Sequence, residues 1–167
     1  DALEESSHVD NTYIVLWGDH GWHLGEKQHW RKHALWEVTT QTTLVIAGPE
    51  GVAKGELCDR PVSLIDLYPT VLEISGLPMR DGLDGVSLAP LLENPVHEWD
   101  RPVQMTFGYE NNAVRTDRWR YIRYNDGGEE LYDHNEDPNE WTNLAGNPEY
   151  NSVIERLKKS LPKTNRK

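Results

Sequence analysis

Asp19 and His20 stand side by side directly after the most strand-like run of the chain, Thr12–Trp17, and open a glycine-containing turn. A carboxylate oxygen suits a hard divalent cation and an imidazole nitrogen suits a borderline one, so the pair could supply half of a metal site. Ligands of open α/β sheets gather outside the carboxyl ends of the strands, where this pair is expected. Two ligands do not complete a site, and a turn-capping aspartate beside a core histidine would have the same sequence.

Lys32 lies in a loop that also carries Lys27, Arg31 and several histidines within an otherwise acidic protein. An anion pocket requires such local positive charge, because a fixed charge in a dry site stabilises developing negative charge. A solvated basic loop would have the same composition. His29 and His33 have the i, i+4 spacing of helical zinc ligands, but no Glu follows His29 and the surroundings are not clearly helical. We therefore do not expect a zinc pair there.

The composition limits the classes of partner. There are 28 acidic and 17 basic residues, which gives a formal net charge of −11. Nonspecific binding of nucleic acid or of an anionic membrane surface needs a basic face, so neither partner is expected, although a few local bases could hold a small anion. Every apolar run falls short of the about 18 residues of a transmembrane helix. Cys58 is the only cysteine, which excludes an internal disulfide.

Residues 1–102 have the pattern of an α/β protein. The runs Thr12–Trp17 and 43–47 are apolar on both faces, as parallel strands covered on both sides would be. Asp66 is typical of a helix N-cap, with Ser63 as an alternative start. The first part of the chain is therefore predicted to be a remnant of a parallel sheet with its helix.

From residue 103 the pattern changes to short strands separated by Asn, Asp and Gly, which predicts a small antiparallel sheet. Asn147 and Pro148 are typical of a helix N-terminus. Apolar residues at helical spacing then form one stripe that should pack on the sheet. The predicted strands cover 103–107, 113–116, 119–124 and 130–132, and the stripe consists of Tyr150, Val153, Ile154, Leu157 and Leu161. We expect residues 103–167 to form a small domain of their own.

Five segments occur in a recognisable order. They are 12–26 (a strand, then Asp-His-Gly-x-x-Leu-Gly-Glu), 30–37 (Trp-x-Lys-x-x-Leu-Trp-Glu), 62–78, 83–92 (Leu-Asp-Gly-Val-Ser-Leu-Ala-Pro-Leu-Leu) and 130–145 (Glu-Leu-Tyr-Asp-His-Asn-Glu-Asp-Pro and onward). Each is weak alone, but together they resemble the C-terminal part of the type I sulfatases of the alkaline-phosphatase-like superfamily. The nearest resemblance is to the iduronate-2-sulfatase-like bacterial branch.

The resemblance implies roles for particular residues. Asp19 and His20 match the pair that binds the active-site calcium, with Mn²⁺ or Zn²⁺ as the alternative ions. Lys32 matches the catalytic lysine that holds the sulfate group. Trp22 and His23 match the loop beside the sulfate pocket, where contact with the sugar is expected. The family fold, a large α/β domain plus a small antiparallel sheet packed by a C-terminal helix, agrees with the pattern.

The family nucleophile is a formylglycine made from Cys or Ser in a Cys/Ser-x-Pro/Ala-x-Arg motif, which Cys58-Asp59-Arg60-Pro61 does not match. We therefore expect this chain to be the C-terminal part of a sulfatase that desulfates a glycan, inactive without the N-terminal part that is its partner, and periplasmic or extracellular. One alternative is a phosphoesterase or phosphonate hydrolase of the same superfamily. Another is a non-catalytic fragment that binds a glycan or a partner protein.

Overall fold

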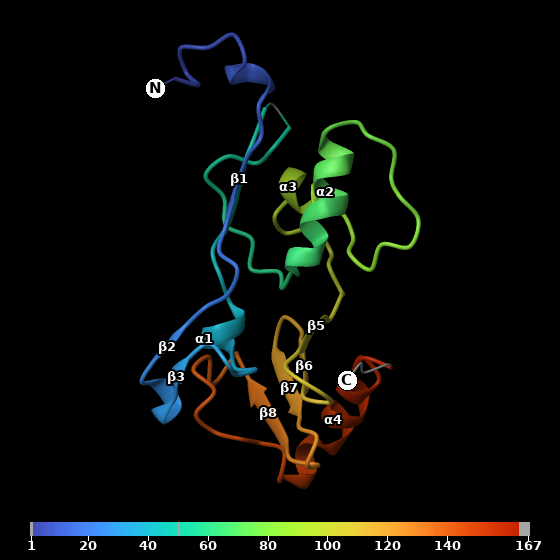
Figure 1. Cartoon of the computed structure of the whole chain (residues 1–167). Helices are drawn as coiled ribbons and strands as arrows, with labels where there is room; N and C mark the ends of the chain where they lie inside the picture. Colours follow the sequence, from blue (N-terminus) through green and yellow to red (C-terminus); the bar gives the residue numbers. More distant parts are fainter. Residues whose placement is uncertain (1, 50, 164–167) are drawn as a thin grey trace. The chain divides into compact units, whose positions relative to one another are not determined.

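The computed structural model describes residues 2–49 and 51–163 (Figure 1). The chain divides into two compact units, of which the first comprises Asp1–Asp19 and Thr43–Trp99 and the second comprises His20–Thr42 and Asp100–Lys167. The later boundary lies close to the one predicted between residues 102 and 103. The segment 20–42, however, belongs to the same compact unit as the C-terminal sheet.

The first unit is built on two paired strands, β1 (Ile14–Trp17) and β4 (Leu44–Ala47). They run antiparallel, so the expectation of parallel neighbours is wrong for this pair. An uninterrupted apolar run indicates a strand but carries no information on the direction of its neighbour. Leu16 and Trp17 are also 60% and 52% exposed, which differs from the predicted covering on both faces.

The helices of the first unit begin with a short turn ahead of β1. They are the 3-10 turns η1 (Val9–Asn11) and η3 (Leu64–Asp66) and the helices α2 (Leu67–Ile74) and α3 (Ala89–Glu93). The Ser63 backbone N–H donates to Asp66 Oδ2 at 2.8 Å, as in a capping box. Both predicted helix starts therefore belong to one N-terminal turn. Asp66 is wholly buried, and its Oδ1 accepts from the Val86 N–H at 2.9 Å.

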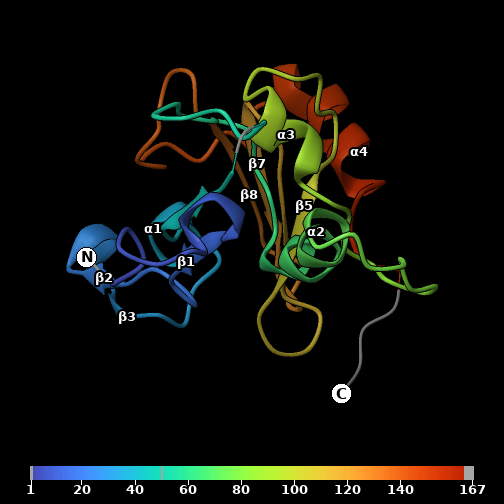
Figure 2. The ribbon, with the colours of Figure 1, turned by 90° about the horizontal axis from the view of Figure 1, so that it is seen from above.

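The second unit contains a four-stranded antiparallel meander in the order β5-β6-β7-β8 (Figure 1). Its strands are β5 (Val103–Thr106), β6 (Asn112–Arg115), β7 (Trp119–Arg123) and β8 (Glu129–Asp133), each within about two residues of the prediction. The turn η4 (Pro148–Tyr150) leads into α4 (Asn151–Lys158), which lies along one face of the sheet (Figure 2). The Asn147 side chain accepts from the Glu149 N–H at 3.0 Å, so the predicted N-cap is confirmed.

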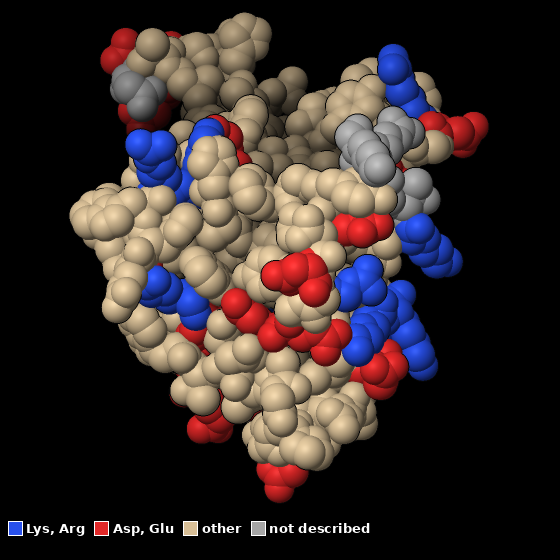
Figure 3. All heavy atoms as spheres, turned by 60° about the horizontal axis from the view of Figure 1, so that its bottom comes forward, with Lys and Arg blue, Asp and Glu red and all other residues tan. Residues whose placement is uncertain are grey.

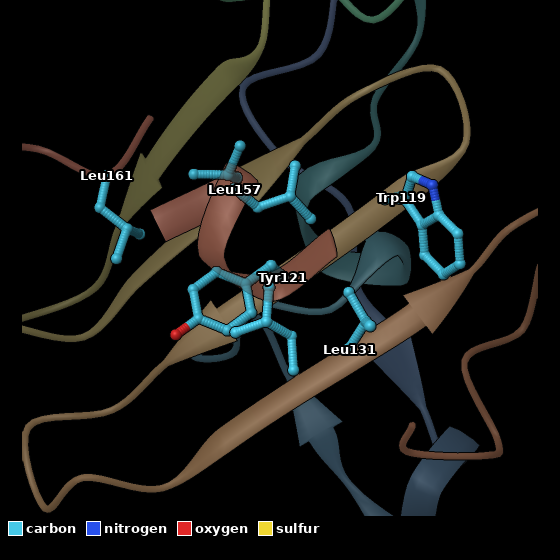
Figure 4. Packing of buried hydrophobic residues seen from close by; sticks show 7 residues of the cluster. Trp119, Tyr121, Leu131, Leu157 and Leu161 are labelled. Carbon is cyan, nitrogen blue, oxygen red and sulfur yellow. The ribbon is translucent and has the colours of Figure 1, made fainter. Parts of the chain in front are cut away.

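Helix α4 buries its apolar stripe against one face of this sheet, as Figure 4 shows. Leu157 and Leu161 form one buried cluster with Trp119 and Tyr121 of the sheet, and Tyr121 has no exposed surface. Because neighbouring residues of a strand point to opposite faces, Ile122 belongs to the other side. That side packs against the segment 20–42 in a second cluster, which consists of Leu35, Ala113, Ile122 and Tyr132. The small sheet is thus covered on both faces.

The segment 20–42 forms a short hairpin and one helical turn. The hairpin pairs β2 (His23–Leu24) with β3 (Trp30–Arg31), with the turn η2 (Glu26–Gln28) at its tip, and α1 (Glu37–Thr40) follows. This segment carries the histidines and the lysine on which the functional prediction depends.

No described helix combines the length and the apolar character that crossing a bilayer would require. On the face shown in Figure 3, acidic and basic side chains lie close to one another. The net charge of −11 is therefore not gathered on that face as one acidic patch.

Candidate functional site

The structure brings two of the predicted site residues together. Lys32 Nζ lies 2.9 Å from His20 Nε2, although the two residues are far apart along the loop. His20 Nδ1 lies 2.8 Å from the Gly21 carbonyl oxygen. A carbonyl oxygen only accepts, so Nδ1 carries the ring proton and Nε2 presents a lone pair to the Lys32 ammonium. The ring is thereby fixed in one tautomer.

Gly21 is the residue that lets helix α1 hold this turn. Its N–H donates to the Thr39 carbonyl oxygen at 2.9 Å. A Cβ atom at position 21 would lie 1.9 Å from the Val38 carbonyl oxygen and 2.6 Å from that of Gln41, so only glycine fits. The first N–H of α1, from Glu37, in turn donates to Glu140 Oε2 at 2.9 Å. The His20 turn is therefore anchored, through α1, to the C-terminal half of the second unit.

Asp19 directly precedes His20, and the division into compact units falls between them. The donor set suits a divalent cation, because Asp19 offers hard carboxylate oxygen and His20 offers Nε2. The contact from His20 Nδ1 to a backbone carbonyl is the usual support of a metal-ligating histidine. The residue types and the support of the His20 ring suit a divalent cation, and a metal at Asp19 and His20 stays a prediction.

Trp22 and His23 have opposite surroundings. Trp22 is 49% exposed, and its ring lies 6.1 Å from that of His20, centroid to centroid. His23 has no exposed surface, and its ring packs edge-on against His29 at 5.1 Å and Trp36 at 5.6 Å. Strand β2 thus turns the His23 side chain inward in this structure, and the predicted contact between His23 and a sugar stays untested. Trp22 remains accessible beside His20.

The sequence analysis missed a buried ionic cluster. Among the described residues, ligand-type atoms of Glu37, His134 and Glu140 lie within 4.8 Å of one another, which is compatible with a metal ion. Two arginines already contact these carboxylates: Arg120 Nε lies 2.6 Å from Glu140 Oε1, and Arg115 Nε lies 3.2 Å from Glu37 Oε2. Their positive charge is what a cation would otherwise supply, so the cluster serves as an ion-pair bridge between α1 and the sheet.

The electrostatics of Glu37 agree with this interpretation. Burial would raise the pKa of the Glu37 carboxyl, but the Arg120 and Arg115 guanidinium groups outweigh it and hold that pKa below its usual value. No sequence motif indicates this cluster, because its members come from three segments that are far apart in the sequence. An arginine in a strand is ordinarily expected on the solvent side, whereas Arg120 is only 1% exposed.

Known proteins are similar to this chain over nearly all of its length. A "Sulfatase" from Formosa agariphila is 47% identical over 165 residues, which cover 99% of this chain and 32% of the relative. The solved structure of BT4656 in complex with its substrate D-glucosamine-2-N,6-O-disulfate is 28% identical, with a TM-score of 0.80, covering 95% of this chain and 35% of that one. A phosphonate monoester hydrolase from Silicibacter pomeroyi is 26% identical, with a TM-score of 0.81. The match covers 95% of this chain and 35% of that protein.

The chain thus spans about a third of the length of the curated relatives it matches. Residues 25–167 match the family model described as N-sulphoglucosamine sulphohydrolase, C-terminal. The match begins within the hairpin that carries the lysine loop and runs through the sheet and α4. The chain belongs to this family of C-terminal sulfatase domains.

Proposed function

We propose that the longer enzyme of which this chain forms a part hydrolyses a sulfate ester on a sulfated glycan. The observation that carries the proposal is the contact between Lys32 and His20 on the Asp-His-Gly turn. The similarity to a sulfatase and to a protein solved with a disulfated glucosamine supports it. The resemblance of the five sequence segments favours the iduronate-2-sulfatase-like branch within the family.

Lys32 is the residue proposed to hold the sulfuryl group. Its ammonium has three N–H donors, of which one meets His20 Nε2 and the others can donate to sulfuryl oxygens. A fixed positive charge at that place stabilises the charge that develops on those oxygens during sulfuryl transfer. His20 acts as a positioning residue, since its contact with the Gly21 carbonyl oxygen fixes which ring nitrogen faces Lys32.

A divalent cation held by Asp19 and His20, Ca²⁺ by resemblance or else Mn²⁺ or Zn²⁺, would add positive charge beside the sulfuryl oxygens. His20 Nε2 has a single lone pair, which serves either Lys32 or a cation. When a cation occupies His20 Nε2, all three N–H donors of Lys32 can donate to the substrate. Trp22, exposed beside His20, is the proposed sugar contact.

The nucleophile is proposed to lie on the N-terminal part of the same enzyme, as a formylglycine. Cys58 is exposed, and the residues around it do not have the formylglycine motif. The N-terminal part is therefore the partner that completes the site. A periplasmic or extracellular location would suit a glycan substrate.

The test is to measure sulfate release by the full-length enzyme and by its Lys32→Ala variant. Loss of one preorganised donor should lower kcat by about 10²–10³-fold. Lys159→Ala, which removes an exposed lysine after α4, is the matched control and should keep wild-type turnover. Unchanged turnover in Lys32→Ala would reject the role of Lys32.

A phosphonate or phosphate ester hydrolase of the same superfamily is the second candidate. The similarity of this chain to a phosphonate monoester hydrolase favours it. The two functions are separated by comparing kcat/KM for a sulfate ester and a phosphonate monoester that carry the same leaving group. A higher value for the phosphonate would replace the sulfatase proposal.

A further inference from the structure

The elements on both sides of the Lys32 loop contact one residue that is far away in the sequence, Glu140. The loop runs from strand β3 to helix α1, whereas Glu140 lies in the loop that follows strand β8. All of these segments belong to the second unit. The Glu140 side chain is only 1% exposed, so its contacts are shielded from water.

On the hairpin side, the contact is made by Lys27 at the tip, in the turn η2. Its ammonium donates to the Glu140 carbonyl oxygen, and to the Tyr132 hydroxyl at 3.1 Å. The same ammonium lies 4.9 Å from the centre of the Trp36 ring and 4.5 Å from that of the Tyr132 ring. Aromatic faces attract a cation at such distances. Lys27 thus fastens the hairpin to the C-terminal part of the chain.

On the helix side, the contact is made by the Glu140 carboxylate. Its Oε2 accepts from the N–H of Glu37, the first residue of α1, at 2.9 Å. The first N–H groups of a helix have no partner inside the helix, so this contact satisfies one of them. Glu140 Oε1 lies 2.6 Å from Arg120 Nε and 2.9 Å from His134 Nε2. The carboxylate is therefore itself held in place, and the start of α1 with it.

The two residues joined by the hairpin contact both have a backbone conformation that side chains rarely allow. The φ angle is 59° at Glu140 and 54° at Lys27, in the left-handed region. Such a conformation is costly for a residue other than glycine and persists only where the surrounding contacts impose it. Outliers of this kind cluster at functional sites, so their coincidence at one contact favours a role beyond folding.

We propose that Glu140 is a positioning residue for Lys32, an inference that rests on the proposed sulfatase function. Lys32 is exposed and directly follows β3, and its ammonium must stay beside His20 to meet the sulfuryl group. Glu140 fixes the elements before and after this loop and so limits the movement of Lys32. A displaced ammonium would lose the preorganisation by which a fixed charge stabilises the transition state.

The test measures sulfate release by the full-length enzyme in a double-mutant cycle. Lys27→Met removes the ammonium that contacts Glu140 and keeps an unbranched side chain. It should lower kcat by about tenfold with little change in KM, because Lys32 acts most strongly in the transition state. In the Lys32→Ala background the same substitution should have no further effect, since no lysine is left to position.

Glu140→Ala, which frees the first N–H of α1, should lower kcat in the same way and should also have no further effect in the Lys32→Ala background. Circular dichroism at the assay temperature shows which variants are folded. Should Glu140→Ala fail to fold, the cycle with Lys27→Met decides alone. Lys159→Met, the same substitution as at Lys27 but at an exposed lysine after α4, is the control and should keep wild-type kcat.

The outcomes separate the positioning role from the proposed function. The same loss of kcat with and without Lys32 would mean that these contacts support the fold without acting through Lys32, and the inference would be overturned. Unchanged kcat in the folded single variants would overturn it as well, and both results leave the sulfatase function in place. Absence of sulfate release by the wild-type enzyme, or unchanged kcat in Lys32→Ala, would instead refute the proposed function and the positioning role with it.

Discussion

The rings of His23, His29 and Trp36 pack edge-on against one another, and the His23 ring has neither exposed surface nor a hydrogen-bond partner on either nitrogen. The nearest carboxylate oxygen, Glu26 Oε2, is 3.7 Å from Nδ1. Burial, followed by repulsion from His29, lowers the pKa of His23 below 6.5. The ring is therefore neutral near pH 7 and supports the hairpin by packing alone.

The first prediction concerns the pH dependence of stability. The unfolded chain binds a proton at His23 near pH 6.5, whereas the folded chain binds it only at lower pH. The unfolded state thus holds more protons, so the free energy of unfolding should fall as pH decreases from about 7 through the folded pKa. His23→Phe removes this proton while keeping a ring of similar shape.

Urea unfolding at pH 7.5, 6.5 and 5.5 provides the measurement. The wild-type chain should lose stability over this range, and His23→Phe should lose less. The pKa of Glu37 is lowered, so the contribution of Glu37 to the free energy of unfolding is lost only below its ordinary pKa of 4.5. It therefore does not affect measurements between pH 7.5 and 5.5. Parallel pH profiles for the two proteins would contradict the burial argument.

The second prediction concerns Arg120, whose substitution should lower the stability of the second unit strongly. Its side chain and that of Glu140 are both 1% exposed and form an ion pair, and Arg120 also donates to the Leu35 carbonyl oxygen at 2.8 Å. Removing one partner of a buried pair leaves an uncompensated charge. Arg120→Ala should therefore lower the free energy of unfolding by about 3–5 kcal/mol.

Lys158→Ala is the control for that measurement by chemical denaturation. Lys158 pairs with Glu129 and Glu155 near the surface, where an ion pair contributes about 0–1 kcal/mol. Similar losses in the two variants would mean that the Arg120 cluster is no more important than a surface pair.

At the scale of elements, helix α1 connects the small sheet to the His20 turn. The Gly21 N–H contacts the last turn of α1, and no Cβ fits between them. Gly21→Ala should force the turn away from Val38 and displace His20 from Lys32. We expect a fall in kcat of the full-length enzyme of about tenfold or more, since small misplacements at a reacting centre are costly.

Gly146→Ala is the matched control, because nothing lies within 4 Å of a Cβ atom at that position. Both variants are compared by turnover and by circular dichroism. If Gly21→Ala kept wild-type turnover, the turn would not need α1 as its support.

Elements with local signals were predictable from the sequence. Asn147 caps its helix, and Asp66 closes a capping box, because both motifs act within a few residues. The proximity of His20 and Lys32 followed only from the family resemblance. Other features depend on contacts between distant segments, which one sequence without an alignment does not reveal. They are the antiparallel pairing of β1 and β4, the burial of the His23 side chain and the ion pairs of Arg120.

At the scale of the molecule, the first unit leaves an apolar surface on its strand pair. Leu16 and Val45 face each other across β1 and β4 and are 60% and 51% exposed. Side chains of this kind are normally buried when they lie on adjacent strands, and an exposed apolar strand pair favours aggregation. We therefore expect the proposed N-terminal part of the enzyme to cover them.

The double variant Leu16→Thr, Val45→Thr tests this covering. Threonine keeps the tendency to form strands but is more polar, so the isolated chain should become more soluble and bind less of a hydrophobic dye. In the full-length enzyme the same change should lower Tm by several degrees, because burying a Leu or Val side chain contributes about 1.5–3 kcal/mol. Val96→Thr, at a position 77% exposed, should alter neither property. An unchanged Tm in the full-length double variant would show that the strand pair stays in contact with water in the complete enzyme, and the proposed arrangement with the N-terminal part would then be wrong.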